Sequence, residues 1–413
     1  MVTIKPFKAV RPTVELASRV AALPYDVYSR AEAREAAAKD PLSFLNIDRP
    51  ETQFEQGHDM YAPEIYRKAD QMIRSEEEKG IFAEEKEACY YIWCLTMNGR
   101  DQTGLVALSS VDDYEKGIIK RHELTRKDKE EDRFRHIDTT SCQTGPIFLA
   151  YRNHKEVSSL VEEKMSEPCL YDFTAEDGVR HRVWKIERPD RIATLTGAFA
   201  SLDCTYIADG HHRAASAVSV SRKRRAEHPD YSGKEEFNYF LSVLFPDNEL
   251  EIMDYNRVLR DLNGLTEEQV LNRLSEVFGI EKVQQGPYRP EEKGRMGLYL
   301  GSEWYKLTVR PELVRKDPIG ILDVEYLQRE VLGPVFGIED PRTDSRIDFV
   351  GGIRGLPELE RRCREDCKCA FAMYPTSISE LFDVADAGLL MPPKSTWFEP
   401  KLRSGLFLHK IER

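Results

Sequence analysis

The fold of this chain is decided by the stretch CTYIADGHHRAASA, residues 204–217. Residues 205–208 are too few for a helix and are rich in β-branched and aromatic side chains, so they predict a buried strand. Residues 214–225 contain strong helix formers and predict a helix. Gly210 therefore lies at a turn that joins a strand to a helix.

The start of this predicted helix has the features of an anion site. The first backbone amides of a helix have no acceptor within the helix, and the helix dipole adds partial positive charge there. A phosphate is therefore expected to accept hydrogen bonds from the amides after Gly210 and from the guanidinium of Arg213. His211 and His212 add two imidazoles to this turn. Asp209, at the end of the strand, offers a carboxylate to a Mg²⁺ ion or to a substrate hydroxyl.

A purely structural interpretation of the same residues stays open. In it, Asp209 caps the helix, Gly210 makes the turn, and both histidines are solvated residues of the first turn. No structural role requires two histidines and an arginine together at one helix start, which favours the functional interpretation.

Length and composition predict a soluble enzyme-sized protein. A chain of 413 residues with 41% hydrophobic and 32% charged residues predicts about two to three domains. No apolar run approaches the roughly 18 residues of a membrane helix, and residues 1–12 lack the apolar core of a signal peptide. We therefore expect no membrane segment and a cytoplasmic location. Eight cysteines are too few for a disulfide scaffold, so reduced thiols are expected.

The charge balance disfavours nucleic acid as a partner. A net charge of −12 and a pI near 5.5 differ from the basic surface that neutralises phosphates in DNA-binding proteins. One local exception is the basic run at residues 222–225. It lies at the end of the predicted helix, where cations interact favourably with the helix dipole, so a solvated helix end is the preferred interpretation.

Three modules are expected along the chain. Residues 1–110 contain a capping box at Ser29 and a β-hairpin around Asn98-Gly99, and form an N-terminal α/β module. Residues 111–260 contain the anion turn, and residues 261–413 form a C-terminal α/β module. The mixed charges of residues 127–135 predict a helix with an exposed, salt-bridged face.

Two further sites lie outside the turn. His122-Glu123 precede this charged helix and follow a short apolar segment, so their side chains are expected to face a cleft. Residues 391–401 concentrate cations, hydroxyls and an aromatic residue in a non-helical loop. Lys394 in this loop either contacts the same anion or belongs to a loop that its prolines stiffen for structural reasons.

Several long motifs identify the chain as a member of the bacterial and archaeal DUF1015 family. They are LPYDV at 23–27, HELT at 122–125 with KEEDR at 129–133, IADGHHR at 207–213, RIDF at 346–349 and PPKSTWF at 392–398. The family in turn resembles the ParB/sulfiredoxin fold and the ADP-dependent free-serine kinases built on it. This resemblance implies an α/β (α+β) protein with a ParB/sulfiredoxin-like mixed-sheet core around residues 111–250 and with N- and C-terminal elaborations.

The resemblance also implies roles for individual residues. The Asp-Gly-His/Thr-x-Arg motif of the kinases matches Asp209, Gly210, His211 and Arg213, and their upstream glutamate base is matched by Glu123. The reactive cysteine of sulfiredoxin would fall in this turn. Histidines occupy the turn instead, so sulfinic-acid reduction is disfavoured.

The hypothesis that follows is a nucleotide-dependent phosphotransferase, similar to a serine kinase, that acts on a small hydroxylated metabolite. ADP or ATP with Mg²⁺ is the expected cofactor, with Asp209 as the metal ligand. The expected catalytic residues are Glu123, Asp209, His211 and His212. The expected nucleotide ligands are Gly210, His211, His212, Arg213, His122 and Lys394. Two alternatives stay open, a ParB-like nucleotide-binding DNA-partition protein and a nucleotide sensor without turnover. The sequence predicts no oligomeric state.

Overall fold

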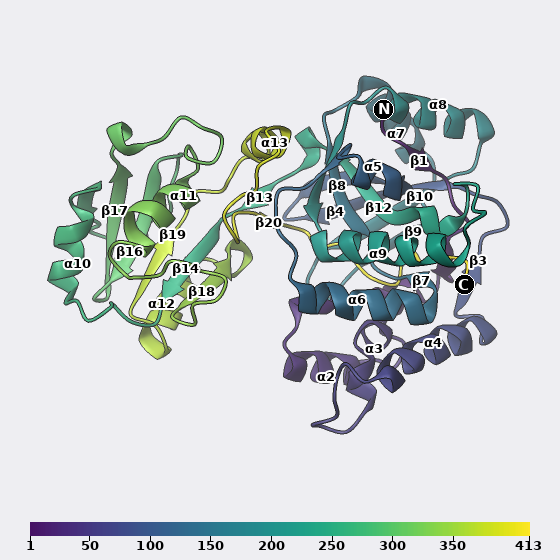
Figure 1. Ribbon diagram of the computed structural model, residues 1–413, viewed down its shortest axis with the longest axis horizontal. Coiled ribbons are helices and arrows are strands. Elements are labelled where there is room, and N and C mark those ends of the chain that lie inside the picture. Colours follow the sequence, from purple (N-terminus) through teal and green to yellow (C-terminus); the bar gives the residue numbers. More distant parts are fainter. The chain divides into compact units, whose positions relative to one another are not determined.

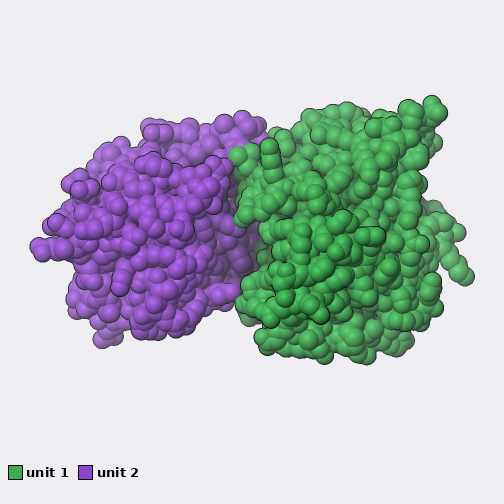
Figure 2. Space-filling view, turned by 60° about the horizontal axis from the view of Figure 1, so that its bottom comes forward, with its two compact units in different colours: residues 1–250, 400–413 green, residues 251–399 purple.

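Residues 1–413, described by a computed structural model, fold into two units that each contain a sheet (Figure 2). The first unit combines residues 1–250 with 400–413, and the second is formed by residues 251–399. The predicted mixed α/β class is confirmed. The division differs from the three expected modules, because strands from 1–110 and from 111–260 hydrogen-bond within one sheet. The chain end returns to the first unit, where His409–Lys410 pairs with Cys142–Gln143.

A nine-stranded mixed sheet forms the centre of the first unit. Its order is β6-β11-β8-β12-β5-β4-β10-β9, with β1 added against β5. The pairs β6/β11 and β8/β12 are parallel and the other pairs are antiparallel. The strands are β1 (Ile4–Lys5), β4 (Tyr90–Met97), β5 (Arg100–Ser110), β6 (Ile119–Lys120), β8 (Ile147–Tyr151), β9 (Tyr171–Thr174), β10 (Arg180–Ile186), β11 (Thr205–Asp209) and β12 (Tyr239–Pro246). The predicted hairpin is confirmed, since Asn98 and Gly99 join β4 to β5 with positive φ angles of 53° and 78°.

Helices cover this sheet in successive layers (Figure 1). Helix α9 (His211–Glu227) buries Ala214, Ala217 and Val218 in the same apolar core as the strands. Helix α6 (Lys127–Thr140) packs against α9, and α4 (Pro63–Glu78) packs against α6. The other helices of this unit are α1 (Ala17–Val20), α2 (Arg30–Lys39), α3 (Leu45–Asp48), α5 (Val111–Glu115), α7 (Lys155–Met165) and α8 (Pro189–Ala200). None of the helices has both the length and the apolar character needed to span a membrane.

The prediction of an exposed charged face for residues 127–135 is wrong for the inner side of α6. Asp132 and Arg133 are both buried there and form an ion pair with an N–O distance of 2.9 Å. The Arg133 guanidinium also lies over the Tyr25 ring, 4.0 Å from its centre. Because α4 covers this side of α6, its charged residues must neutralise one another or contact aromatic faces.

The second unit is built on a six-stranded antiparallel sheet with the order β15-β17-β16-β19-β14-β18. Its elements are β13 (Ile252–Met253), β14 (Tyr255–Leu259), α10 (Glu267–Leu274), β15 (Phe278–Lys282), β16 (Arg295–Leu300), β17 (Glu303–Val309), α11 (Asp323–Leu327), β18 (Ile347–Gly351), α12 (Leu356–Glu365), β19 (Cys369–Ala372), α13 (Ile378–Asp386) and β20 (Trp397–Phe398). All eight cysteines of the chain are free thiols, as expected.

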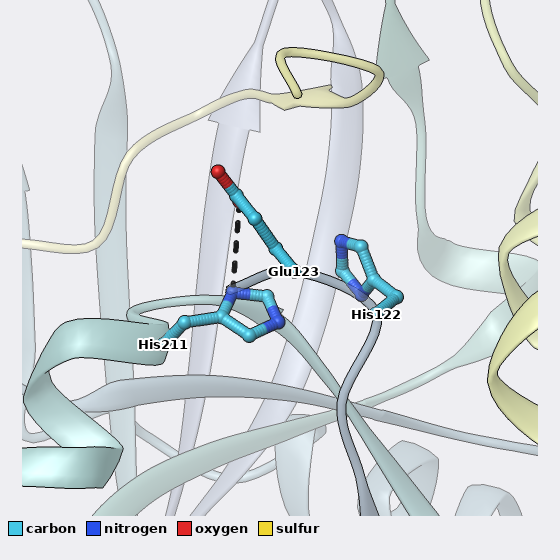
Figure 3. Close-up of side chains that lie close together, drawn as sticks. All are labelled: His122, Glu123 and His211. Atoms are coloured by element: carbon cyan, nitrogen blue, oxygen red, sulfur yellow. Dashed lines mark ion pairs between the residues drawn. The ribbon is translucent and has the colours of Figure 1, made fainter. Parts of the chain in front are cut away.

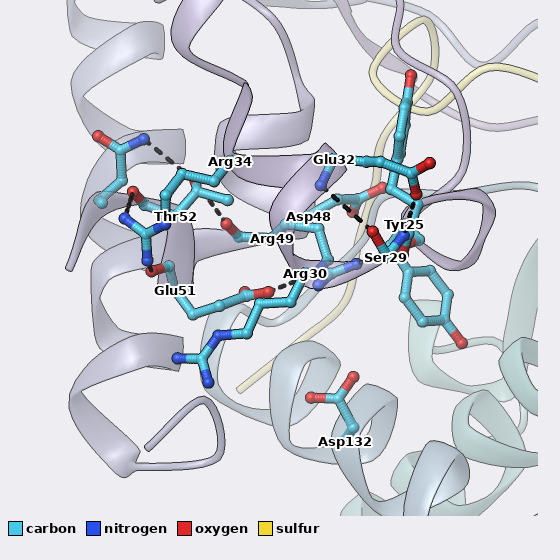
Figure 4. A network of polar contacts seen from close by, with 12 residues as sticks. Tyr25, Ser29, Arg30, Glu32, Arg34, Asp48, Arg49, Glu51, Thr52 and Asp132 are labelled. Atoms are coloured by element: carbon cyan, nitrogen blue, oxygen red, sulfur yellow. Dashed lines mark hydrogen bonds and ion pairs between the residues drawn. The ribbon is translucent and has the colours of Figure 1, made fainter. Parts of the chain in front are cut away.

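A buried polar network fixes the N-terminal segment around Tyr25 (Figure 4). Arg49 is an ion-pair partner of Glu51 at 2.5 Å, and both side chains are less than one-tenth exposed. Its guanidinium also donates to the carbonyls of Tyr25 and Tyr28, at 2.9 and 3.1 Å. Close by, Ser29 caps α2 in the predicted capping box. The network therefore ties the segment at residues 25–28 to the helical layer below the sheet.

Replacing Arg49 by Met should destabilise the first unit by about 3–5 kcal/mol, because it leaves the Glu51 carboxylate buried without its cation. Arg19→Met is the matched control, since Arg19 is half-exposed and pairs with Asp40 on the surface. The control should cost at most about 1 kcal/mol. Urea denaturation followed by circular dichroism measures both, and equal losses of stability would contradict a structural role for the Arg49 network.

Candidate functional site

The site is created by the parallel pairing of β6 with β11. Thr205 and Tyr206 pair with Ile119 and Lys120 in parallel register, so both strands end at the same edge of the sheet. The segments that follow them, His122-Glu123 and residues 209–213, therefore lie next to each other. Parallel strand ends of this kind are a common location for ligand sites in α/β proteins. The structure thus brings Glu123 to the predicted anion turn, although the two are far apart in the sequence.

The predicted strand, turn and helix around Gly210 are present. Gly210 precedes α9 with a φ of 91°, a left-handed conformation that glycine adopts without strain. No side chain caps the first turn of the helix. A Cβ atom on Gly210 would lie 3.3 Å from Nε of Arg213, which shows that the arginine folds back over the turn.

The guanidinium of Arg213 combines positive charge with an unused donor. Its Nη1 donates to the Pro146 carbonyl at 2.6 Å, whereas its buried Nε has no hydrogen-bond partner. Burial alone would lower the pKa of this group, but the nearby carboxylates of Asp26 and Asp209 outweigh that effect and raise its pKa. Arg213 therefore stays charged, and one N–H of its guanidinium remains available to an anion.

Both carboxylate oxygens of Asp209 already have partners. Oδ1 accepts from the Gly210 amide at 2.8 Å, and Oδ2 accepts from the ammonium of Lys401 at 3.0 Å. Burial would raise the pKa of Asp209, but the charges of Lys401 and Arg213 outweigh it and hold the pKa well below its usual range. Asp209 is thus an ionised residue that orients two neighbours and is a weak base. The ammonium of Lys401 already binds one oxygen of Asp209, and the assignment of Asp209 as a Mg²⁺ ligand stays a prediction.

His122, Glu123 and His211 form a compact cluster beside the turn (Figure 3). Nδ1 of His211 lies 3.9 Å from Oε2 of Glu123, and the two imidazole rings pack edge to face with their centres 4.5 Å apart. One ligand atom from each residue lies within 4.8 Å of the other two. The rings are 1% and 5% exposed for His122 and His211, whereas the Glu123 side chain is 39% exposed. The carboxylate is therefore the part of the cluster that solvent reaches.

Both imidazoles of the cluster are neutral near pH 7. Burial lowers the pKa of His122 to about 4, and the carbonyl of Ile207 opposes this only weakly. Burial and the neighbouring His122 lower the pKa of His211 well below its ordinary value. The ring nitrogens of His122 and Nε2 of His211 make no hydrogen bond of good geometry, and the Ile207 carbonyl is the acceptor that the His122 ring approaches. Buried unpaired nitrogens are costly, which makes them candidates for a ligand contact.

The other two residues predicted for the site have different surroundings. Nε2 of His212 accepts from the Arg126 amide at 2.9 Å, so this histidine ties the start of α9 to the start of α6. Lys394 belongs to the second unit. Its carbonyl accepts from Arg257 at 3.0 Å, and its ammonium lies 5.7 Å from the centre of the Tyr255 ring.

Sequence reasoning missed two charged residues near the turn. Lys401 lies in the same cationic loop as Lys394 and is the lysine that pairs with Asp209. Asp26 is the carboxylate that raises the pKa of Arg213 most. Asp26 belongs to the LPYDV motif, and this motif was the only signal in the sequence that could have pointed to it.

Comparisons with known proteins give one family and several distant structures. The family model described as protein of unknown function (DUF1015) matches residues 4–325. No curated protein matches the chain.

Three solved structures share a low level of similarity. A free serine kinase in complex with AMP is 14% identical, with 73% of this chain and 91% of that chain covered and a TM-score of 0.34. SbnI with a C-terminal truncation, from Staphylococcus aureus, is 11% identical, with 73% and 87% covered and a TM-score of 0.39. A conserved hypothetical protein from Pyrococcus furiosus is 14% identical, with 73% and 94% covered and a TM-score of 0.34. With scores this low, the roles of individual residues must rest on the geometry of this chain's own site.

Replacing Lys401 by Met should raise the pKa of Asp209 and lower stability at neutral pH by about 1–3 kcal/mol. A carboxyl group with a depressed folded pKa stabilises the fold above its unfolded pKa of about 3.9 and loses this contribution as the pH falls. The stability difference between wild type and variant should therefore persist from pH 7 to about pH 4 and shrink below it, so that it is clearly smaller at about pH 2.5 than at pH 7. Urea denaturation at both pH values measures it.

The control is Lys410→Met, which removes a more exposed ammonium that pairs with Glu77. Its effect on stability should stay below about 1 kcal/mol at pH 7. A Lys401→Met difference that is the same at both pH values would show that the lysine acts through packing and not through the charge of Asp209.

Proposed function

We propose that this chain, which belongs to the DUF1015 family, transfers a phosphoryl group from a nucleotide to the hydroxyl group of a small molecule. The observation that carries the proposal is the turn at Gly210, where uncapped helix amides lie under the guanidinium of Arg213. Backbone amides and a guanidinium with an unused N–H are the donors that bind phosphate oxygens.

In this mechanism the terminal phosphate of ADP or ATP lies against the first amides of α9. Arg213 donates to its oxygens, and Lys401 lies nearby because Asp209 holds its ammonium. Phosphoryl transfer depends chiefly on such positioning and charge neutralisation. His211 and His212 flank the same amides, and His211 contributes as a neutral donor because its pKa lies far below 7.

Glu123 acts as the general base. Its carboxylate is half-exposed beside the turn, whereas Asp209 is held ionised by two cations and is poorly suited to accept a proton. Glu123 takes the proton of the acceptor hydroxyl. The oxygen of that hydroxyl attacks the terminal phosphorus, and the bond between this phosphorus and the leaving oxygen of the nucleotide breaks. His122 supports the cluster from its buried side, and the assignment of Lys394 as a nucleotide ligand stays a prediction.

The basic run at the end of α9 does not favour the alternative of a DNA-partition protein. Each of its four cations forms an ion pair with a carboxylate of the first unit: Arg222 with Glu115, Lys223 and Arg224 with Asp138, and Arg225 with Asp112. A cation that is already paired releases few counterions on contact with DNA and adds little to affinity. The other alternative is a nucleotide sensor without turnover. Such a protein would bind the nucleotide at the same turn but form no phosphorylated product.

Glu123→Gln should keep nucleotide affinity and lower turnover by about 10²–10⁴-fold, because the amide cannot accept the proton. The matched control is Glu131→Gln, an exposed carboxylate of α6 that pairs with Arg135. Transfer of label from the terminal phosphate of ADP or ATP to a library of small hydroxylated compounds measures turnover. Near-wild-type turnover of Glu123→Gln would remove Glu123 from the mechanism. Nucleotide binding without any labelled product in the wild type would favour the sensor.

Arg213→Ala should weaken nucleotide binding by about 1.5–3 kcal/mol, the contribution of a charged hydrogen bond. Arg222→Ala removes an exposed arginine from the far end of the same helix and should leave the affinity unchanged. Isothermal titration calorimetry with ADP and ATP compares the two variants. Equal affinities of wild type and Arg213→Ala would contradict binding of the phosphate at this turn.

A further inference from the structure

We propose that His122, Glu123 and His211 form a binding site for a divalent transition-metal ion such as Zn²⁺, and that the bound ion blocks phosphoryl transfer by occupying Glu123. The first half of this proposal stands on the cluster alone. The second half rests on the proposed function, because it takes Glu123 to be the general base.

The donor set matches the preference of transition metals. Two imidazoles and one carboxylate bind Zn²⁺ or Fe²⁺ in many proteins, whereas Mg²⁺ prefers oxygen ligands alone. No other group of three histidine, cysteine or acidic side chains in this chain brings its ligand atoms so close together. The site is thus distinct from Asp209, whose two oxygens bind the Gly210 amide and Lys401.

The geometry is close to that of a metal centre. Ligands at about 2.0–2.1 Å in a tetrahedral site lie roughly 3.4 Å from one another. The three donor atoms lie within 4.8 Å of one another, and the pair from His211 and Glu123 is 3.9 Å apart. The pair from His211 and Glu123 must therefore close by about 0.5 Å and the other separations by at most about 1.4 Å, and Glu123 is the most exposed of the three side chains. The exposed side of the cluster leaves the remaining coordination position to water.

The buried nitrogens supply an independent reason for a ligand here. Both rings are buried and pack edge to face with their centres 4.5 Å apart, so their nitrogens lie at a site that solvent reaches only past Glu123. Three of their four ring nitrogens make no hydrogen bond of good geometry, although the His122 ring approaches the Ile207 carbonyl. Coordination would satisfy one nitrogen of each ring. In dedicated metal enzymes a well-aligned acceptor holds each ligating imidazole from behind; here Nε2 of His211 has none, so we expect the ion to bind reversibly.

Inhibition follows from the shared carboxylate. A Glu123 carboxylate that coordinates a cation cannot at the same time take a proton from the acceptor hydroxyl. Zn²⁺ should therefore lower turnover, with an inhibition constant equal to its measured dissociation constant. Because Mg²⁺ is a poor ion for two imidazoles, it should not produce this inhibition.

The test uses the full chain without an affinity tag. Calorimetry with Zn²⁺ should show one ion bound per chain. The absorption spectrum of the Co²⁺ complex should lack the charge-transfer band that a thiolate ligand produces. His211→Ala and Glu123→Gln should each weaken binding at least about tenfold. His58→Ala, a control histidine that pairs with Glu64, should not change it. Circular dichroism of each variant confirms that the fold is retained.

A thiolate band in the Co²⁺ spectrum, or binding that Cys363→Ser removes, would place the ion on the cysteines of the second unit and overturn the proposal. Binding of Zn²⁺ that is unaffected by Glu123→Gln would also overturn it. Phosphoryl transfer that continues with the site saturated by Zn²⁺ would overturn the inhibitory half. If no transfer is detected in any condition, the proposed function fails, while the calorimetry with Zn²⁺ still decides whether the metal site exists.

Discussion

The parallel pairing of β6 with β11 is the constraint on which the candidate site depends. Each strand ends in a polar segment, and parallel register places both ends at one edge of the sheet. An antiparallel pair would have put His122-Glu123 at the opposite edge from the Gly210 turn. The β6 strand has only two residues, so its position depends on α5, which packs against it, as well as on its own hydrogen bonds. The starts of α9 and α6 carry the two site segments, and His212 ties them together, so the packed layer of α9, α6 and α4 positions the site as well as covering the core (Figure 1).

Charge compensation ties distant parts of the first unit to the same turn. Arg213 lies over Gly210 and donates to the Pro146 carbonyl, Asp209 binds Lys401 from the C-terminal segment, and the N-terminal Asp26 raises the pKa of Arg213. Partly buried charges of this kind are costly unless each has a partner, so the four segments must be in place together. This explains why residues 400–413 return to the first unit after the chain has completed the second.

The sequence predicted those features of the site that are encoded locally. The strand, the glycine turn and the helix of residues 204–217 follow from the composition of one short stretch, and the capping box at Ser29 follows from four residues. The buried side of α6 could not be predicted in this way, because the charges of Asp132 and Arg133 indicate exposure until α4 and Tyr25 cover them. The same holds for Lys401. Two lysines in one loop carry the same local signal, and only the tertiary fold pairs one of them with Asp209.

The site separates fixed charges from groups that can react. Arg213 and Asp209 stay charged near pH 7, since nearby groups of opposite charge stabilise their charged forms. The two buried imidazoles are permanently neutral there, since burial disfavours their protonation. Neither set exchanges protons readily at this pH, which leaves the half-exposed Glu123 as the carboxylate that a substrate can reach. In the proposed function the fixed charges bind the anion and the neutral rings do not repel one another. The proposed proton transfer and the proposed metal coordination both use the Glu123 carboxylate.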